Sequence, residues 1–569
     1  MAQKKYPLYE TTVFKDFRVM VEQSAEKFPE KVAFSFKKNP RDSEIVRVTY
    51  AESRETIRSL ATELTARGAR DKKVVILGEN SYAWITSYFA LMTMGAVTVP
   101  LDKDLPADEL AATMKTAETA FVFYSASIEE KAKTIASSLP EETVFFCLGE
   151  SKTGFGTNFA DLVASGRERV ENGDSSYLDY EIDPDRLASI VFTSGTTGKG
   201  KGVMLSQTNI VSDMTQGMYN FAITPKTLCV LPPQHTLCST VNYTGHYAQG
   251  SEIYISSGIR YVVQEIKEQQ PSHLLLVPLF IDTMYKKLWA NAEKQGKADL
   301  LRKMMKFSNG IRKIGIDVRR SLFKDVLASF GGKLEMIICG GAPLNQDIID
   351  TFEALGITIL NGYGITECAP LISCNRNKWQ KKGSVGTPII GEQVKIADPD
   401  ENGEGEICVK GPNVMLGYFN DPEATKAAFD SDGYFKTGDY GKLDGDGWIY
   451  ITGRLKNLII FKNGKNVYPE EIETEISRIG GVNEVIVYAG ESKSQPDKEV
   501  IVAEIYPDYD YLKEHGVENP QEYFEKGIKE INARSVSYKA VHLVKLRTEE
   551  FEKNTTKKIL RFKIDKTID

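Results

Sequence analysis

The sequence predicts an α/β fold, with a large N-terminal domain of stacked αβ subdomains followed by a small, mobile α+β C-terminal domain. Up to about residue 400, short β-branched runs alternate with helical stretches, which is typical of βα units around largely parallel sheets. Several of these runs end in Gly-rich turns, where α/β folds place ligands. Beyond that point short strands are joined by Asp-Gly and Asn-Gly turns, which favour tight hairpins.

The individual elements follow from their residue patterns. "KKVVILGEN" (72–80) and "VTVPL" (97–101) are expected strands, and the helical "YAWITSYFALMTMGA" (82–96) lies between them. Further strands of this kind are "HLLLVP" (273–278), "LEMIICGGA" (334–342) and "ITILNGYG" (357–364). The tail returns to strand and helix patterns after a boundary near 453–457. We therefore expect domains at 1–453 and 454–569, the second within normal domain size.

Composition excludes several classes of function. The 569 residues exceed a single core, and 41% apolar with 26% charged residues is ordinary for a soluble globular protein. A net charge of −7 argues against nucleic acid as the main partner. No apolar run of about 18 residues or secretory signal is present, so a cytoplasmic protein is expected. The seven cysteines lack C-x-x-C spacing and the five histidines lack H-E-x-x-H, which disfavours disulfides and zinc.

The stretch "TSGTTGKGKG" (193–202) nearly matches the P-loop pattern. Gly202, however, stands where a Ser or Thr would have to bind Mg²⁺. The expected order here is strand, loop, strand, helix, with Ser206 as the helix N-cap, whereas a P-loop leads directly into a helix. Hydroxyls, glycines and lysines in this loop suit a clamp on a polyphosphate. A flexible, solvated hairpin tip is the alternative.

In its wider context this loop resembles the phosphate loop of the adenylate-forming superfamily. That group contains acyl-CoA synthetases, the adenylation domains of peptide synthetases, and luciferases. Further matching motifs occur in family order over most of the chain: "FTSGTTGKGKGVMLSQTN" (192–209), "CGGAPL" (339–344), "NGYGITECAP" (361–370), "YFKTGDYG" (434–441), "ITGRLKNLIIFKNGKNVYPEEIE" (451–473) and "KNTTKKILRFK" (553–563). The chain is most similar to the long-chain fatty acid–CoA ligases.

The resemblance implies a nucleotide site built from these motifs. Phosphates would be held by the loop residues Thr193, Ser194, Gly195, Thr196, Thr197, Gly198 and Lys201. The adenine side would be formed by Gly341, Ala342, Gly362, Tyr363, Gly364 and Thr366. Asp439 would accept hydrogen bonds from the ribose, and Arg454 would contact ribose or phosphate. Glu367, with Thr196, would bind Mg²⁺, because a hard cation prefers oxygen ligands.

The resemblance also implies catalytic roles in the C-terminal region. Lys558 would bridge carboxylate and α-phosphate, since the following Ile559 and Arg561 match the family pattern. The family commonly has Gly at the preceding position, where this chain has Lys557, so Lys557 is the alternative. Lys456 would be the hinge, followed by Asn457 where the family often has an acidic residue. After adenylation, rotation of the C-terminal domain would present the face around Gly464 to coenzyme A. An unpaired surface Glu367, a core Tyr363, a turn-forming Asp439 and a solvated basic tail remain alternatives.

The expected activity is ATP-dependent conversion of a long- or medium-chain fatty acid to acyl-AMP, then to acyl-CoA. His235 and Gly340 would line the acyl pocket. The alternatives are delivery to a separate carrier-protein thiol and a non-enzymatic nucleotide-binding protein. Basic residues interleave with apolar ones over 297–324, a pattern that could rest peripherally on an anionic membrane. An ordinary surface helix with its apolar stripe in the core is the alternative.

Overall fold

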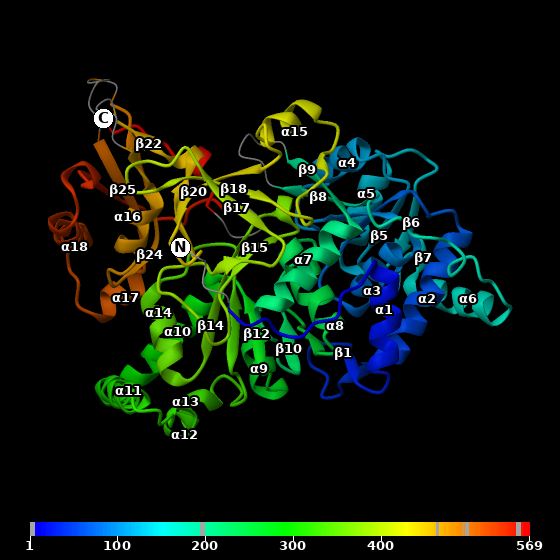
Figure 1. The fold of residues 1–569 in the computed structure, drawn as a ribbon, viewed down its shortest axis with the longest axis horizontal. Coiled ribbons are helices and arrows are strands. Elements are labelled where there is room, and N and C mark those ends of the chain that lie inside the picture. The colour runs from blue at the N-terminus through cyan, green and yellow to red at the C-terminus, as the bar shows by residue number, and fades with distance from the viewer. Residues whose placement is uncertain are drawn as a thin grey trace.

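The computed structural model describes residues 6–193, 200–461, 466–492, 494, 500–553 and 559–568. Figure 1 shows a large α/β body that holds the N-terminal part of the chain, with the C-terminal helices α16, α17 and α18 gathered at one end. The predicted α/β class with a large N-terminal and a smaller C-terminal part is therefore confirmed. None of the helices in these ranges is long and apolar enough to cross a membrane.

The first large sheet carries the phosphate-loop hairpin at one edge. Its strands run in the order β19 (Gly417–Tyr418), β9 (Lys201–Ser206), β8 (Leu187–Thr193), β4 (Val97–Leu101), β3 (Lys73–Leu77), β5 (Phe121–Tyr124), β6 (Val144–Cys147) and β7 (Thr157–Asn158). From β8 to β7 the pairs are parallel, whereas β9 and β19 add antiparallel strands. The two strands of the hairpin are in register at Thr193 and Lys201.

The hairpin confirms the predicted order of strand, loop, strand and helix. Helix α7 (Gln207–Asn220) follows β9, and its N-cap Ser206 forms a capping box with Asn209. Gly202 lies within β9, where an added Cβ would be 3.0 Å from a side-chain methyl of Ile190 and 3.2 Å from the Cβ of Phe419. The glycine that breaks the P-loop pattern is thus required by close packing against its neighbours.

The second large sheet supplies the adenine-side motifs. Its order is β16 (Thr387–Pro388), β15 (Leu371–Cys374), β14 (Thr358–Gly364), β13 (Met336–Cys339), β12 (His273–Leu276), β10 (Lys226–Cys229), β11 (Glu252–Ile255), β1 (Val32–Phe36) and β2 (Val46–Thr49). The strands from β14 to β1 are parallel. All six expected runs therefore form elements as predicted, with α3 (Tyr82–Met94) as the helix.

Alternation along the strands creates a stacked arrangement. On β3, Val74 and Ile76 belong to the main core, while Val75 and Leu77 pack in a second core with α4 (Ala107–Thr116) and α5 (Glu129–Ala136). On β12, Leu275 joins the main core, and Leu274 and Leu276 face a third one. That third core also holds residues of α9 (Val262–Gln269), α10 (Pro278–Lys294), α11 (Ala298–Arg312), α13 (Lys324–Ala328) and α14 (Gln346–Leu355).

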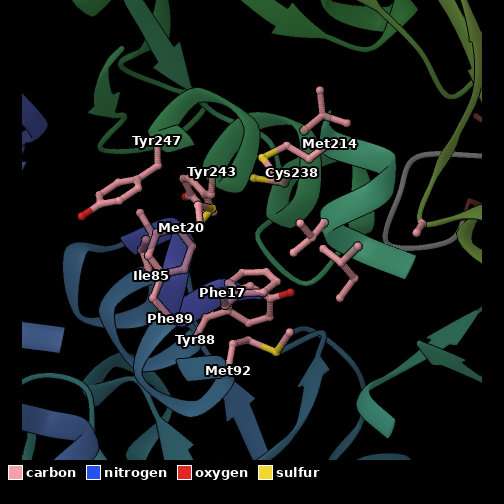
Figure 2. Close-up of a cluster of buried hydrophobic side chains, with 14 of the residues drawn as sticks. Phe17, Met20, Ile85, Tyr88, Phe89, Met92, Met214, Cys238, Tyr243 and Tyr247 are labelled. Atoms are coloured by element: carbon pink, nitrogen blue, oxygen red, sulfur yellow. The ribbon is translucent and has the colours of Figure 1, made fainter. Parts of the chain in front are cut away.

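The main core lies between the two large sheets. It contains residues of α1 (Phe17–Lys27), α2 (Tyr50–Ala66), α3, α7, a π-helix at Leu237–Gly245, and α8 (His246–Ala248). Figure 2 shows Phe17, Tyr88, Met214, Cys238 and Tyr247, which come from five of these helices, converging in one cluster. Helix α3 is apolar all round because it is buried on every side here.

The later part of the chain forms smaller sheets. The predicted hairpins appear as an antiparallel sheet of β17 (Gln393–Ala397), β18 (Gly405–Lys410), β20 (Phe435–Leu443) and β21 (Ile449–Arg454). The short β22 (Ile459–Ile460) and β23 (Asn466–Val467) pair next. A separate core then unites α16 (Pro469–Ile476), α17 (Tyr509–Glu514) and α18 (Pro520–Arg534) with β24 (Val482–Gly490), β25 (Val500–Pro507) and β26 (Leu543–Leu546). The boundary at 453/454 remains a prediction.

Candidate active site

Several predicted site residues lie outside the described ranges. They are the loop residues Ser194, Gly195, Thr196, Thr197 and Gly198, the residue Gly464, and both candidate catalytic lysines, Lys557 and Lys558. Their roles remain predictions. The other predicted residues fall into two contacting groups and a connecting turn.

The first group, which we call the ribose corner, consists of Tyr363, Asp439 and Arg454. The hydroxyl of Tyr363, near the end of β14, donates to Oδ2 of Asp439 at 2.8 Å. Nε of Arg454 lies 2.8 Å from the other carboxylate oxygen, Oδ1. Strand register explains the ion pair, because Asp439 on β20 is directly opposite Arg454 on β21. Residues 76 and 15 positions from Asp439 are thereby brought together.

Burial gives the ribose corner its rigidity. Asp439 is 3% exposed and Tyr363 is 6% exposed. Burial, and next the charge of Asp439, hold the pKa of the Tyr363 phenol well above its ordinary value, so this hydroxyl stays a donor. Each carboxylate oxygen has two lone pairs, so one oxygen can accept more than one hydrogen bond. A buried carboxylate that is held in one orientation can accept hydrogen bonds from the hydroxyl groups of a sugar.

The second group, the phosphate corner, consists of Lys201, Tyr418 and Glu367. Tyr418 on β19 lies beside β9, where it pairs with Val203. Its hydroxyl donates to Oε1 of Glu367 at 2.9 Å, and Nζ of Lys201 lies 4.6 Å from the centre of its ring. One aromatic side chain thus joins the lysine of the phosphate-loop hairpin to the predicted Mg²⁺ ligand. Burial, and next the Glu367 charge, raise the Tyr418 pKa, so the phenol remains protonated.

A tight turn after β14 places Glu367. An added Cβ on Gly364 would lie 2.0 Å from the carbonyl oxygen of Pro370, so only glycine permits this approach. The Ile365 amide donates to the same carbonyl at 2.8 Å. A short 3-10 helix at Thr366–Cys368 then carries Glu367, and the Met415 amide donates to the Glu367 carbonyl at 2.8 Å.

Gly340 joins the adenine side to the predicted acyl region. It follows β13, and an added Cβ would lie 3.6 Å from a methyl of Leu237 and 3.8 Å from the Gly362 carbonyl oxygen. Leu237 opens the π-helix, two residues after His235. Gly341 has a φ of 90°, which favours glycine, and Ala342 beside it is exposed. Gly340 therefore lies against the start of the π-helix that follows His235, while Gly341 and Ala342 are exposed.

The predicted hinge leads into a contact with α16. Lys456 lies in the 3-10 helix Leu455–Asn457 after β21. The side-chain amide of Asn457 donates to Oε1 of Glu470 on α16, which also lies 3.9 Å from Arg561. An acidic residue at position 457 would place two carboxylates together here. In this chain, Asn457 therefore makes a hydrogen bond to Glu470 that an acidic side chain could not donate.

Sequence reasoning missed the support behind the phosphate corner. The fully buried Asn413 donates through Nδ2 to the carbonyls of Leu371 at 2.8 Å and Cys368 at 3.0 Å, and to Oδ1 of Asp213 at 3.3 Å. Asp213 on α7 also accepts from the Leu371 amide at 2.8 Å. One turn earlier, Asn209 donates to the carbonyls on either side of Asn413. We call Asn209, Asp213 and Asn413 the supporting network.

The supporting network ties three motifs together. Helix α7 starts at the end of the phosphate-loop hairpin, and through this network it holds both the Glu367 turn and the segment that leads to Tyr418. Its only sequence signal is isolated Asn and Asp residues in apolar surroundings, which is too common a pattern to single out. Tyr418 was also missed, because its partner Glu367 is 51 residues away.

Buried acidity accompanies this network. Burial raises the pKa of Glu392 to about 7. Burial is also the largest cause that raises the Asp213 pKa well above its ordinary value, and the nearby charge of Glu392 adds to it. Asn413 donates to Asp213, whereas neither of the buried carboxylate oxygens of Glu392 has a hydrogen-bond partner among the described residues. Glu392 and Asp213 belong to neither the ribose corner nor the phosphate corner.

The chemistry of the donor set fits a nucleotide with Mg²⁺. Glu367 offers a carboxylate beside Lys201, and Mg²⁺ bound to nucleotide phosphates commonly needs only one or two protein carboxylates. Within the described ranges there is no group of three or more His, Cys, Asp or Glu residues that could hold a metal by itself. Lys201 offers a positive charge suited to an anion and Asp439 offers acceptors suited to hydroxyl groups, and the Gly364 turn connects the strand of Tyr363 to Glu367.

Comparison with curated proteins gives relatives over most of the chain. Long-chain-fatty-acid–CoA ligase FadD15 of Mycobacterium bovis is 28% identical over 78% of this chain and 76% of its own length. Human long-chain-fatty-acid–CoA ligase 1 is 29% identical over 81% and 69%. The chloroplastic long-chain-fatty-acid–[acyl-carrier-protein] ligase AEE15 of Arabidopsis thaliana is 27% identical over 82% and 73%.

Comparison with solved structures also finds a similar protein over most of the chain. ATP-bound MatB from Rhodopseudomonas palustris is 25% identical, covers 96% of this chain and 98% of its own, and superposes with a TM-score of 0.75. The model of the family described as AMP-binding enzyme matches residues 21–419. That span includes the phosphate-loop hairpin, the Glu367 turn and the whole supporting network. The chain therefore belongs to the AMP-binding enzyme family.

Proposed function

We propose that this protein activates a long- or medium-chain fatty acid with ATP and transfers the acyl group to coenzyme A. The products are acyl-CoA, AMP and pyrophosphate. The observation that carries the proposal is the pairing of the ribose corner with the phosphate corner in a chain of this family. The curated relatives named as long-chain fatty acid–CoA ligases support the choice of acid and acceptor.

In the first step a carboxylate oxygen of the acid attacks the α-phosphorus of ATP, and the bond to the leaving pyrophosphate breaks. Both reactants are anions, so the site has to neutralise charge and hold the line of attack. Asp439 accepts hydrogen bonds from the ribose, and Lys201 binds the leaving phosphates. Glu367 and Thr196 would hold Mg²⁺, which when bound would offset the negative charge of the phosphates. Lys558 bridges the acid and the α-phosphate, with Lys557 as the alternative.

In the second step the thiol of coenzyme A attacks the acyl carbonyl and AMP leaves. We propose that residues 1–453 and 454–569 form the two domains, and that the second rotates about Lys456 between the steps. This rotation would withdraw Lys558 and bring the face around Gly464 to the thiol. The hydrogen bond from Asn457 to Glu470 would then help to set the balance between the two positions.

The acyl chain is proposed to enter past His235 and Gly340 and to lie along the seam between α7 and the π-helix. In that seam the side chains of Met214 and Met218 pack on Gly245, where an added Cβ would lie 2.8 Å from the terminal methyl of Met218. Methionine is unbranched and adaptable, so these side chains can move aside for an alkyl chain. A narrow, apolar seam of this kind favours an alkyl chain over a polar acid.

Two further points concern partners and place. The relative named as an acyl-carrier-protein ligase makes a carrier thiol the second candidate acceptor. We also propose a reducing, cytoplasmic location, because all seven cysteines are free thiols in buried positions. Peripheral membrane contact is proposed from the basic and apolar residues that interleave over 297–324. Small-molecule acid, ATP and coenzyme A are then the main partners, and nucleic acid is not among them.

The test is a mass-spectrometric assay of acyl-AMP and acyl-CoA with ATP and Mg²⁺ over acids from acetate to stearate. Acyl-CoA with a maximum at one fatty chain length is expected, and Gly245→Leu should move that maximum to shorter acids while acetate, if used, is unaffected. Gly445→Leu, at an exposed glycine with open space around it and no positive φ, is the matched control. Acyl-AMP that accumulates without reaching coenzyme A would overturn the acceptor and favour a carrier.

A further inference from the structure

Helix α11 has two apolar faces, of which only one contacts the protein core. Leu301 and Met305 are 6% and 8% exposed and pack in the core that α11 shares with α10 and α14. Leu300 and Phe307 on the same helix are 54% and 63% exposed. The expectation that the apolar stripe of this region simply enters the core therefore accounts for only half of its apolar residues.

The exposed apolar residues form a line. Leu300 and Phe307 are seven residues apart, so they lie on nearly the same side of the helix, separated by about 10 Å along its axis. Ile314, seven residues further, is 74% exposed and follows the C-cap Lys313, whose backbone keeps helical angles. Ile316 beyond it is 51% exposed. Large apolar side chains exposed in such a line indicate an interaction site.

Positive charge surrounds this line. Between residues 297 and 316 there are six basic residues and one acidic residue, Asp299, in a chain whose net charge is −7; the basic residues are Lys297, Arg302, Lys303, Lys306, Arg312 and Lys313. All six are exposed. Arg302 pairs with Asp299, and Arg312 lies 3.9 Å from Glu353. Lys303, Lys306 and Lys313 pair with no carboxylate among the residues that the structure describes.

We propose that α11 and residues 313–316 are the surface by which this protein docks on an anionic lipid bilayer. Phe307, Leu300 and Ile314 would enter the interface, while the lysines beside them extend their ammonium groups to lipid phosphates. Charge complementarity supports this occupant, because each lysine near an anionic membrane contributes attraction. Single apolar side chains separated by lysines also suit lipid better than a packed protein interface, which requires a contiguous apolar centre.

This inference deepens the peripheral membrane contact proposed above by naming its surface, and it does not depend on the proposed catalysis. It would nevertheless serve an enzyme whose substrate partitions into bilayers. Figure 1 shows α11 at the outer edge of the molecule, beside α10 and α12 (Arg319–Leu322) and away from the phosphate-loop strands β8 and β9. Its substitution should therefore leave the site chemistry intact.

The test is co-sedimentation of the full chain with vesicles of phosphatidylcholine alone or mixed with phosphatidylglycerol. Binding is expected only to the mixed vesicles and should weaken as salt is added. Phe307→Ser and the double variant Lys303→Glu with Lys306→Glu should each reduce vesicle binding about tenfold or more. Matched controls are Leu178→Ser, at an exposed leucine of another surface, and Lys115→Glu on α4.

Two results would overturn the proposal. One is that the unaltered protein binds both kinds of vesicle equally, or binds neither. If it binds neither, an acidic protein becomes the expected partner of this surface. The other is a loss in the α11 variants no larger than in the two controls. The circular-dichroism spectrum and the Tm should be unchanged in all four variants, which shows independently of any activity that they are folded.

Discussion

The two corners of the candidate site are held in different ways. In the ribose corner, Asp439 is bonded on both oxygens, to Tyr363 and to Arg454, and the partners are set by neighbouring strands. In the phosphate corner, the Glu367 side chain accepts a hydrogen bond from Tyr418, and Lys201 rests on the ring of the same tyrosine. Strand register makes the first corner rigid, whereas the second depends on the supporting network behind it.

The difference suits what each corner is proposed to bind. A sugar keeps its shape and charge through the reaction, so a fixed carboxylate is the economical way to bind it. Phosphates and Mg²⁺ change their charge distribution as pyrophosphate leaves, and the long side chain of Lys201 can follow that change. The comparison leads to four predictions, ordered from the largest expected effect to the smallest.

The largest effect is expected at the ribose corner. Asp439→Asn removes the ion pair with Arg454 while keeping the shape of the side chain. Because this charge is buried and hydrogen-bonded, kcat/KM for ATP should fall about a hundredfold, equivalent to about 3 kcal/mol. Pyrophosphate exchange measures this. Asp446→Asn, at a half-exposed acid of the same sheet region, is the control, and equal losses in both variants would show that Asp439 has no special role.

The supporting network should matter next. Asn413→Ala leaves the carbonyls of Cys368 and Leu371 without this donor, so we expect the free energy of unfolding to drop by about 2 kcal/mol. The Mg²⁺ concentration for half-maximal activity should rise as well, because the Glu367 turn loosens. Denaturant unfolding and a Mg²⁺ titration test both. Unchanged Mg²⁺ dependence in a destabilised variant would restrict Asn413 to a role in stability.

Acidity behind the phosphate corner gives a pH-dependent effect. The pKa of Glu392 is raised from 4.5 to about 7, so the folded protein binds more protons than the unfolded chain between these values. Stability from this group therefore falls as pH rises through the window and levels off above it. Glu392→Gln should raise Tm by a few degrees at pH 8 and leave it nearly unchanged near pH 5. The reverse order of the two shifts would contradict the assignment, and Asp213→Asn tests the neighbouring acid.

The smallest effect is expected at Tyr418. Tyr418→Phe keeps the ring under Lys201 but removes the hydrogen bond to Glu367, so the Mg²⁺ requirement should rise about fivefold, or about 1 kcal/mol. A Mg²⁺ titration of acyl-AMP formation measures the change. Tyr434→Phe, which removes an exposed tyrosine hydroxyl bonded to Gln393, should have no effect. A similar response of both variants would show that the Tyr418 hydroxyl does not influence the Mg²⁺ requirement.

Much of the fold was predictable because local patterns decide it. The β-branched runs became strands, the Ser206 N-cap formed, and the Asp-Gly region became hairpins. For the candidate site, the sequence offered predictions only where a motif is continuous, as around Glu367 and Asp439, and the roles of these residues remain predictions. Tyr418, Asp213 and Asn413 were missed, since each acts on residues at least 42 positions away and none carries a local signal.

The sequence by itself determined the α/β class, the hairpin order that excludes a P-loop, and the motifs that mark a nucleotide site, because backbone preference and apolar periodicity act over short distances. Only the tertiary structure decided which of these groups touch. It paired Asp439 with Tyr363 and Arg454 through strand register, joined Lys201 to Glu367 through Tyr418, and left one apolar face of α11 exposed beside its lysines. These contacts depend on how distant segments pack, and no local pattern specifies that.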